Sequence, residues 1–147
     1  MPTWMRLAAA GLYAMFTLAA PAAAFELISE KEGKMTKVPF DSERGAVGRG
    51  PSIKIYGPRK SEPSASPFNL QIRFEAYGGA AIDGRSLRVI YFTWPRTDIT
   101  SRLLPQLRDQ VVDLRDVTAP AGAHQMEITV RDSRGYERIV LYEFEIE

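Results

Sequence analysis

The 147 residues include no cysteine and a single histidine, His124. Without cysteine the chain has no disulfides, no zinc–thiolate site, no cysteine nucleophile and no lipidated N-terminal cysteine. With one histidine it cannot build a zinc site from several imidazoles. The protein must therefore be stable through its hydrophobic core alone, and we expect no cofactor.

An excess of either charge is also missing. The chain carries 19 Lys and Arg against 18 Asp and Glu. Arg6 is the only basic residue before Phe25, so the rest of the chain has 18 charges of each sign. A protein that binds a polyanion needs a surplus of positive charge. We therefore expect neither nucleic acid nor an anionic membrane surface as a partner.

The one long apolar stretch lies at the N-terminus. Arg6 precedes an apolar run from Leu7 to about Ala20, and residues 21–24 read Pro-Ala-Ala-Ala. This order predicts a signal peptide over residues 1–24, cleaved after Ala24, and a periplasmic or secreted product. The alternative is an uncleaved anchor, although the run is short and rich in alanine for a span of about 20 residues. No later run approaches that length, so we expect no membrane span once the leader is removed.

The rest of the chain divides into an arm and one domain. Residues 25–50 are charged, end in a glycine-rich stretch and show no sustained period, which predicts an extended N-terminal arm. Residues 25–28 could dock on the domain as a short strand. Residues 51–147 suit a single domain.

A period of two dominates this domain and predicts an all-β fold. It is clearest over residues 68–76, where Phe68, Leu70, Ile72 and Phe74 share one face. Further strands are expected at 52–56, 86–94, 111–117, 125–131 and 138–146, with a hairpin turn over 132–135. Residues 99–103 are ambiguous: we favour a short strand, and the alternative is a helix of one or two turns with Thr100 as its N-cap. Phe74 and Phe144 are expected in one core.

Two stretches resemble the bacterial immunoglobulin-like superfamily. Residues 79–91 read Gly-Ala-Ala-Ile-Asp-Gly-Arg-Ser-Leu-Arg-Val-Ile-Tyr, and residues 120–135 contain Pro-x-Gly-x-His followed by Asp-x-x-Gly. The chain is also similar to small exported proteobacterial proteins, through Arg49-Gly50-Pro51 and Ser66-Pro67-Phe68. The resemblance implies an immunoglobulin-like antiparallel β-sandwich of about seven strands. Such modules serve adhesion, carbohydrate binding and spacing, so the resemblance assigns no catalytic residue.

Few residues qualify for chemistry. His124 shares a strand face with Met126 and Ile128, which favours a structural histidine that holds the neighbouring corner over a general base. Calcium is the metal that this composition favours over zinc, because its ligands are oxygens only. Five aspartates lie near expected strand ends, where turn formation explains them: Asp83, Asp98, Asp113, Asp116 and Asp132. We assign no catalytic, cofactor or metal residue and expect a protein that is not an enzyme.

One apolar stripe remains as a candidate contact surface. If Leu87, Val89 and Tyr91 face the core, strict alternation turns their neighbours Ile90, Phe92 and Trp94 outward. Either local chain covers this stripe, from the arm or from residues 98–112, or it contacts a partner. We expect a binding or structural module that makes protein–protein contacts, with another protein or with a second copy. The alternative is a carbohydrate-binding module or accessory domain that uses exposed aromatic residues.

Overall fold

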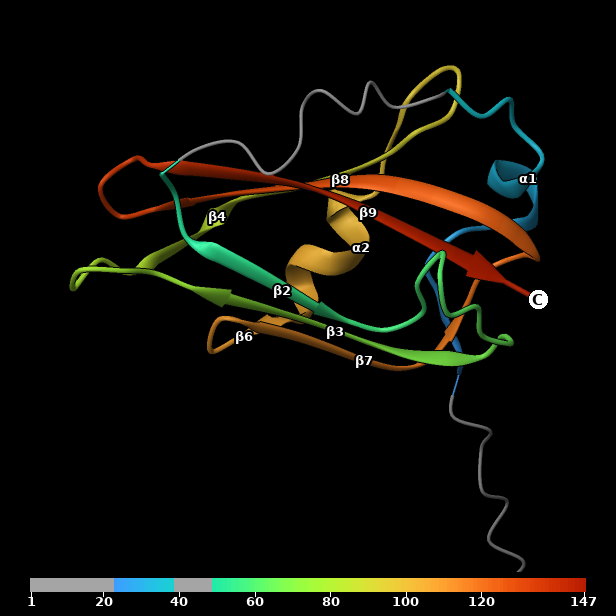
Figure 1. The fold of residues 1–147 in the computed structure, drawn as a ribbon, viewed down its shortest axis with the longest axis horizontal. Helices are drawn as coiled ribbons and strands as arrows, with labels where there is room; N and C mark the ends of the chain where they lie inside the picture. The colour runs from blue at the N-terminus through green and yellow to red at the C-terminus, as the bar shows by residue number, and fades with distance from the viewer. Residues whose placement is uncertain (1–22, 39–48) are drawn as a thin grey trace, which may run out of the picture.

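The described part of the chain is all-β and is built from two sheets. The computed structural model describes residues 23–38 and 49–147 (Figure 1). The expectation of an all-β domain is confirmed by the two sheets, which lie one above the other. The predicted signal peptide falls almost wholly on residues outside the described ones, so it stays a prediction.

The first sheet combines three strands from the first half of the chain with two from the second half. Its order is β1 (Phe25–Glu26), β7 (Val111–Thr118), β3 (Phe68–Glu75) and β2 (Ser52–Tyr56), and the short β6 (Leu107–Arg108) also pairs with β7. β1 runs parallel to β7, and the other pairs are antiparallel. One register row joins Tyr56, Gln71 and Asp113 across three strands.

The second sheet is antiparallel throughout. Its order is β5 (Thr97–Asp98), β4 (Ile82–Tyr91), β8 (Gly122–Asp132) and β9 (Glu137–Ile146). The β8–β9 turn is the expected hairpin, with Gly135 at a φ of +86°. Because glycine has no Cβ, it adopts this left-handed conformation without strain.

The core lies between the sheets and follows the predicted alternation. The inward residues of β3 are all buried, and Phe74 and Phe144, each 1% exposed, belong to the same cluster. In β8 and β9 the buried residues also recur at every second position. A strand with one face toward the core requires this period, which explains why the sequence pattern located these strands well.

The connection between the sheets differs from the expected strand at residues 99–103. It is a short helix, α2 (Thr100–Leu103), followed by a 3₁₀ turn, η2 (Leu104–Gln106), so the favoured strand is wrong and the short-helix alternative is right. Ile99 and Leu103 are fully buried. Residues four apart lie on one face of a helix and also on one face of a strand, so the sequence pattern did not separate the two structures. The N-cap is Ile99 and not Thr100. The Thr100 backbone N–H instead donates to Asp98 Oδ1, and η2 contacts both β4 and β7.

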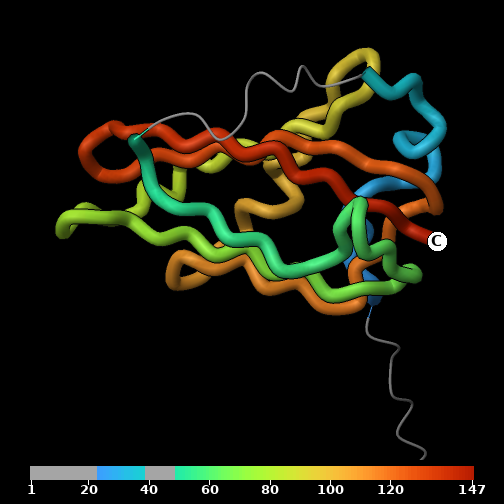
Figure 2. The backbone as a smooth tube through the Cα atoms, in the orientation of Figure 1, coloured from blue at the N-terminus to red at the C-terminus, as the bar shows by residue number. Residues whose placement is uncertain are grey.

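Part of the expected arm packs on the domain. β1 is the docked strand that residues 25–28 allowed, and a helix, α1 (Glu30–Gly33), follows it. Leu27 and Ile28 are buried in the core cluster. Figure 2 follows this segment from the first sheet toward the second, where Trp94 N–H donates to Thr36 O. The rest of the arm, residues 39–48, lies outside the described residues.

Candidate functional site

The candidate site lies beyond the end of β4, where the expected stripe breaks up. Leu87, Val89 and Tyr91 are buried as alternation predicts. Ile90 is half-buried, Phe92 is 1% exposed and Trp94 is 74% exposed. The three stripe residues therefore do not form one continuous surface.

The stripe is interrupted where strand β4 ends and neighbouring chain covers Phe92. β4 stops at Tyr91, and the Thr93 N–H donates back to Tyr91 O over 3.0 Å, which turns the chain. Tyr91, Phe92 and Thr93 are buried in succession. Phe92 nevertheless lies outside the core cluster and lines a hollow with Ala123 and Gln125, which flank buried His124 on the outward side of β8. Phe92 therefore keeps the outward side that alternation predicts, and its burial comes from local cover.

The N-terminal arm covers the backbone on this side. Lys37 forms a bridge with Thr93, and the Val38 N–H donates to Phe92 O. The Arg96 guanidinium lies over the Phe92 ring, 4.4 Å from its centroid. Of the two covers considered from the sequence, the arm is the one that pairs with this segment, and a cation from the β4–β5 loop adds to it.

A small hollow of about 260 Å³ opens beside Phe92. Its lining is Phe92, Val38 and Ala123, with the side chains of Lys37 and Gln125. Trp94 follows Phe92 by two residues and leaves most of its indole in water. An apolar hollow lined by Phe92, together with an exposed indole two residues further along the chain, is suited to binding an apolar side chain of another molecule.

A series of hydrogen bonds links β8 and β4 to Lys37, which also lines the hollow. His124 Nε2 is 2.7 Å from Pro120 O, and its Nδ1 is 2.8 Å from the Tyr91 hydroxyl. A carbonyl only accepts, so Nε2 carries the proton, and Nδ1 accepts from the Tyr91 O–H. The Tyr91 oxygen in turn accepts from Lys37 Nζ. Each polar group in this series has a partner of matching polarity.

The electrostatics favour this arrangement of protons. Burial lowers the pKa of His124, and the positive charge of Lys37 adds to that effect. Burial also lowers the pKa of Lys37 and raises the pKa of Tyr91 to about 12. His124 is therefore neutral at pH 7, with both ring nitrogens engaged. It makes the loop contact that a structural histidine was expected to make, and its side chain is buried at 2% exposure.

A second set of contacts anchors the arm near this site. Arg102 Nη1 donates to Leu27 O over 2.6 Å and to Glu32 Oε2 over 2.9 Å, and Nη2 donates to Glu32 Oε1 over 2.6 Å. Glu32 also closes a capping box with Ser29 at the start of α1. Hydrogen bonds from Arg102 lower the pKa of Glu32 to about 2. Arg102 thus ties α2 to the arm that supplies Lys37.

Three of the five aspartates named from the sequence accept hydrogen bonds from backbone N–H groups a few residues further along the chain. Asp83 accepts from Arg85 N, Asp98 from Thr100 N, and Asp132 from Arg134 N and Tyr136 N. Within residues 23–38 and 49–147, no three His, Asp or Glu side chains lie close enough together to hold a metal ion. These aspartates therefore act as the local caps that their positions predicted.

The sequence did not identify Lys37 and Arg96 as residues of the candidate site. Lys37 lies in a stretch without any period, and its contact with Tyr91 spans 54 residues. The Ser29-x-x-Glu32 spacing is the one local signal that marks this segment, because it is a capping-box pattern that starts a helix.

Comparison with protein-family models, with curated proteins and with solved structures finds no match. Among the described residues, no helix has the length and apolar character to cross a bilayer.

Proposed function

We propose that this chain is an exported, non-catalytic binding module that makes protein–protein contacts in the cell envelope. The observation that carries the proposal is the combination of Trp94, 74% exposed, with the apolar hollow at Phe92. Burying a large aromatic side chain against a partner recovers roughly 1.5–3 kcal/mol of hydrophobic free energy. Tryptophan and arginine, both present here, are the residues most enriched at energetic centres of protein interfaces.

The strand order supports an immunoglobulin-like β-sandwich as the scaffold of this module. One sheet contains the order β2-β3-β7, with β1 and β6 added beside β7, and the other has the order β5-β4-β8-β9. These orders are compatible with the two antiparallel sheets of such a sandwich. In such a sandwich the loops cluster at the two ends, and binding residues are carried there by a rigid core. Trp94 occupies the β4–β5 loop and is held by the backbone pairing with Thr36.

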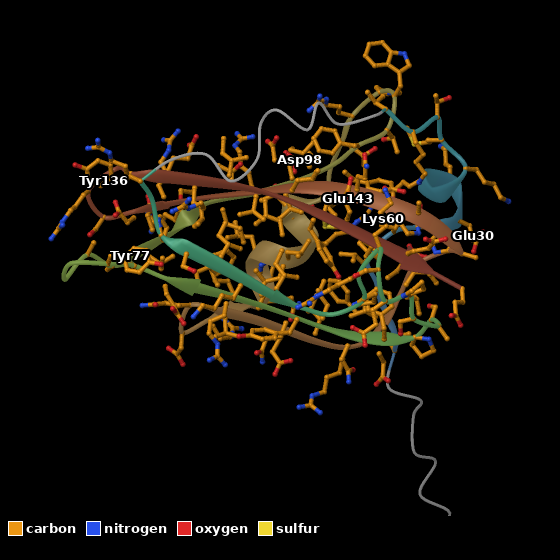
Figure 3. All side chains as sticks on the ribbon, viewed as in Figure 1. Glu30, Lys60, Tyr77, Asp98, Tyr136 and Glu143 are labelled. Carbon is orange, nitrogen blue, oxygen red and sulfur yellow. The ribbon has the colours of Figure 1, made fainter. Side chains whose placement is uncertain are left out.

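The distribution of exposed aromatics favours a protein over a sugar at Trp94. Tyr77 and Tyr136 lie together at one end of the molecule, in the turns before β4 and between β8 and β9 (Figure 3). Trp94 follows the other end of β4, a strand of 10 residues. A strand of that length spans about 33 Å, so these rings do not form the flat row along which a sugar chain would stack.

The state of His124 supports a non-catalytic role. Its Nδ1 accepts from Tyr91 and its Nε2 donates to Pro120, so the chain's one imidazole is committed to structure. A hydrolase would have to rely on a pair of carboxylates with separated pKa values. The one strongly shifted carboxyl among the described residues, Glu32, is engaged by Arg102 and by the α1 cap.

Site-specific photocrosslinking in the producing cell tests the proposal. A photoreactive amino acid is placed at Trp94 and, as a matched control, at Tyr136, which is also exposed but lies away from the hollow. We expect a discrete protein adduct from position 94, either with another protein or with a second copy of this chain. Equal adducts from both positions, or none from position 94, would contradict the proposal.

A further inference from the structure

The outer face of the first sheet carries a second hollow, separate from the site at Phe92. It has a volume of about 480 Å³ and is lined chiefly by Tyr56, Asn69, Gln71, Asp113 and Arg115. Tyr56 is opposite Gln71, and Gln71 is opposite Asp113, so three of these side chains form one row across β2, β3 and β7. Residues opposite one another project to the same face, with Cβ atoms about 4.5–5.5 Å apart.

The side chains in this hollow offer both donors and acceptors. Asp113 supplies a carboxylate and Arg115 a guanidinium, and neither side chain makes a hydrogen bond or ion pair with any described residue. Asn69 Oδ1 accepts a long bond from Asp116 N, and Gln71 Oε1 accepts a long one from Arg73. The amide NH₂ groups of Asn69 and Gln71 are then available as donors.

The hollow also contains an aromatic face and a rigid floor. Tyr56 is 49% exposed at the end of β2. Beneath the row, Leu70, Ile72, Val112 and Leu114 are buried at 0–3% exposure, which fixes the three strands. Polar side chains held on a packed sheet lose little freedom on binding, and this pre-organisation favours a ligand.

This chemistry fits a neutral sugar better than an ion. Each sugar hydroxyl both donates and accepts, so it is satisfied by neighbouring carboxylate, amide and guanidinium groups. The C–H bonds of a pyranose ring carry slight positive charge and pack against the negative face of an aromatic ring. The charges of Asp113 and Arg115 cancel, whereas a phosphate site would need an excess of cations.

We propose that this hollow binds a neutral saccharide chain, with Tyr56 as the stacking platform. Gln71 and Asp113 hydrogen-bond the hydroxyls along the row, and Asn69 and Arg115 do so beside it. The row covers two inter-strand spacings, about 10 Å, which is enough for a disaccharide segment. This site does not depend on the proposed protein contact at Trp94.

The test is an NMR titration of the ¹⁵N-labelled exported protein with three neutral oligosaccharides: maltohexaose, cellohexaose and tetra-N-acetylchitotetraose. At least one saccharide is expected to shift the amide signals of Tyr56, Gln71, Asp113 and Arg115. Tyr56→Ala should weaken this binding by about tenfold or more, whereas Tyr56→Phe keeps the ring and should stay within about threefold of wild type. Tyr136→Ala is the matched control, because Tyr136 is exposed to the same 49%.

Several results would overturn the proposal. These are the absence of any shift with all three saccharides at millimolar concentration, shifts confined to other residues, or equal weakening by Tyr136→Ala. If Tyr56→Ala does not fold, Arg115→Gln must weaken binding in its place. Trp94→Ser must leave saccharide binding unchanged. A loss of saccharide binding in that variant would also contradict the saccharide site at Tyr56. That result is distinct from a loss of protein binding at Trp94.

Discussion

The Tyr91 hydroxyl donates to His124 Nδ1 over 2.8 Å and so joins β4 to β8 inside the domain. The same histidine donates from Nε2 to Pro120 O, and the same tyrosine accepts from Lys37. The two residues thereby connect the loop before β8 to the N-terminal arm. In this hydrogen-bond network, one assignment of donors and acceptors satisfies every group, and that assignment requires a neutral imidazole.

Replacing His124 should therefore lower stability without changing the binding surface. His124→Gln leaves the Tyr91 hydroxyl and the Pro120 carbonyl with poorer partners, and we expect a loss of about 1–3 kcal/mol in the free energy of unfolding. Urea unfolding measures this. Thr129→Gln, on the opposite face of the same strand, is the control and should stay within about 0.5 kcal/mol. Loss of partner binding at unchanged stability would contradict a structural role.

The pH dependence of stability should report the same histidine. The folded pKa of His124 lies below its usual 6.5, so the unfolded chain binds the proton more readily. The contribution of His124 to stability is therefore complete above about pH 6.5 and decreases as the pH falls below it. Unfolding free energies of His124→Gln should vary less over that range than those of wild type. An identical pH dependence would show that folding does not lower the pKa of His124.

Breaking the Arg102–Glu32 pair should release the arm. Arg102→Met removes three charge-assisted hydrogen bonds from a partly buried site, and we expect a loss of about 1.5–3 kcal/mol. Arg88→Met is the control, because its contact with Asp98 is long, at 3.9 Å, and exposed. That exposed pair should contribute at most about 1 kcal/mol. Equal effects in the two variants would show that Arg102 does not anchor the arm.

Glu32 should give a separate signature in acid. Its pKa falls from a usual 4.5 to about 2 in the folded protein. The stability that ionised Glu32 contributes is then complete above about pH 4.5 and is lost as the pH falls toward about 2. Glu32→Gln should be less stable than wild type near neutral pH and should lose less stability over this acid range. Parallel acid unfolding curves would contradict the lowered pKa.

Because Phe74 and Phe144 share one core, we expect truncation of either side chain to lower the stability by a similar amount. Both are 1% exposed within one cluster that draws on both sheets. Phe74→Ala and Phe144→Ala should each cost about 3–5 kcal/mol, a large share of the stability of a small domain. Thermal unfolding measures the effect. A melting temperature within a degree or two of wild type in either variant would place that ring outside the core.

The leader prediction has its own test. Arg6, the apolar run and the final alanines predict cleavage after Ala24, and Phe25, the next residue, begins strand β1. N-terminal sequencing of the exported protein should therefore read Phe-Glu-Leu-Ile. A membrane-bound product that retains Met1 would contradict cleavage.

Local pattern predicted the strands that have one buried face. The alternation in β3 and β9 follows from the core on one side and solvent on the other, and Gly135 marked the hairpin. β4 was less well predicted, because it begins at Ile82 and ends at Tyr91 rather than spanning 86–94. A register shift between Asp83 and Arg88 disturbs its first half, and the turn at Thr93 ends it early.

The candidate site could not be assembled from local pattern. Phe92 is covered by a backbone segment from the arm and by Arg96, and neither contact follows from strand periodicity. Arg102 meets Glu32 across 70 residues. Such pairings depend on where the arm crosses from one sheet to the other, which is a property of the whole fold.

Trp94 separates the proposed binding role from a purely structural one. Trp94 and Trp4 are the two tryptophans of the chain, so Trp94 alone reports by fluorescence once the leader is removed. Because its indole is 74% exposed, Trp94→Ser should leave the free energy of unfolding within about 0.5 kcal/mol of wild type. Phe92→Ser, at a buried position, should instead destabilise the fold by about 3–5 kcal/mol.

The most direct measurement is the affinity of wild type and Trp94→Ser for the protein trapped by crosslinking at position 94. Titration calorimetry, or sedimentation equilibrium if that protein is a second copy of the chain, gives the dissociation constant. We expect the variant to keep its stability and to bind at least about 30-fold more weakly, which corresponds to a loss of about 2 kcal/mol at an interface centre. Unchanged affinity in a stable Trp94→Ser variant would contradict a protein-contact function for this site.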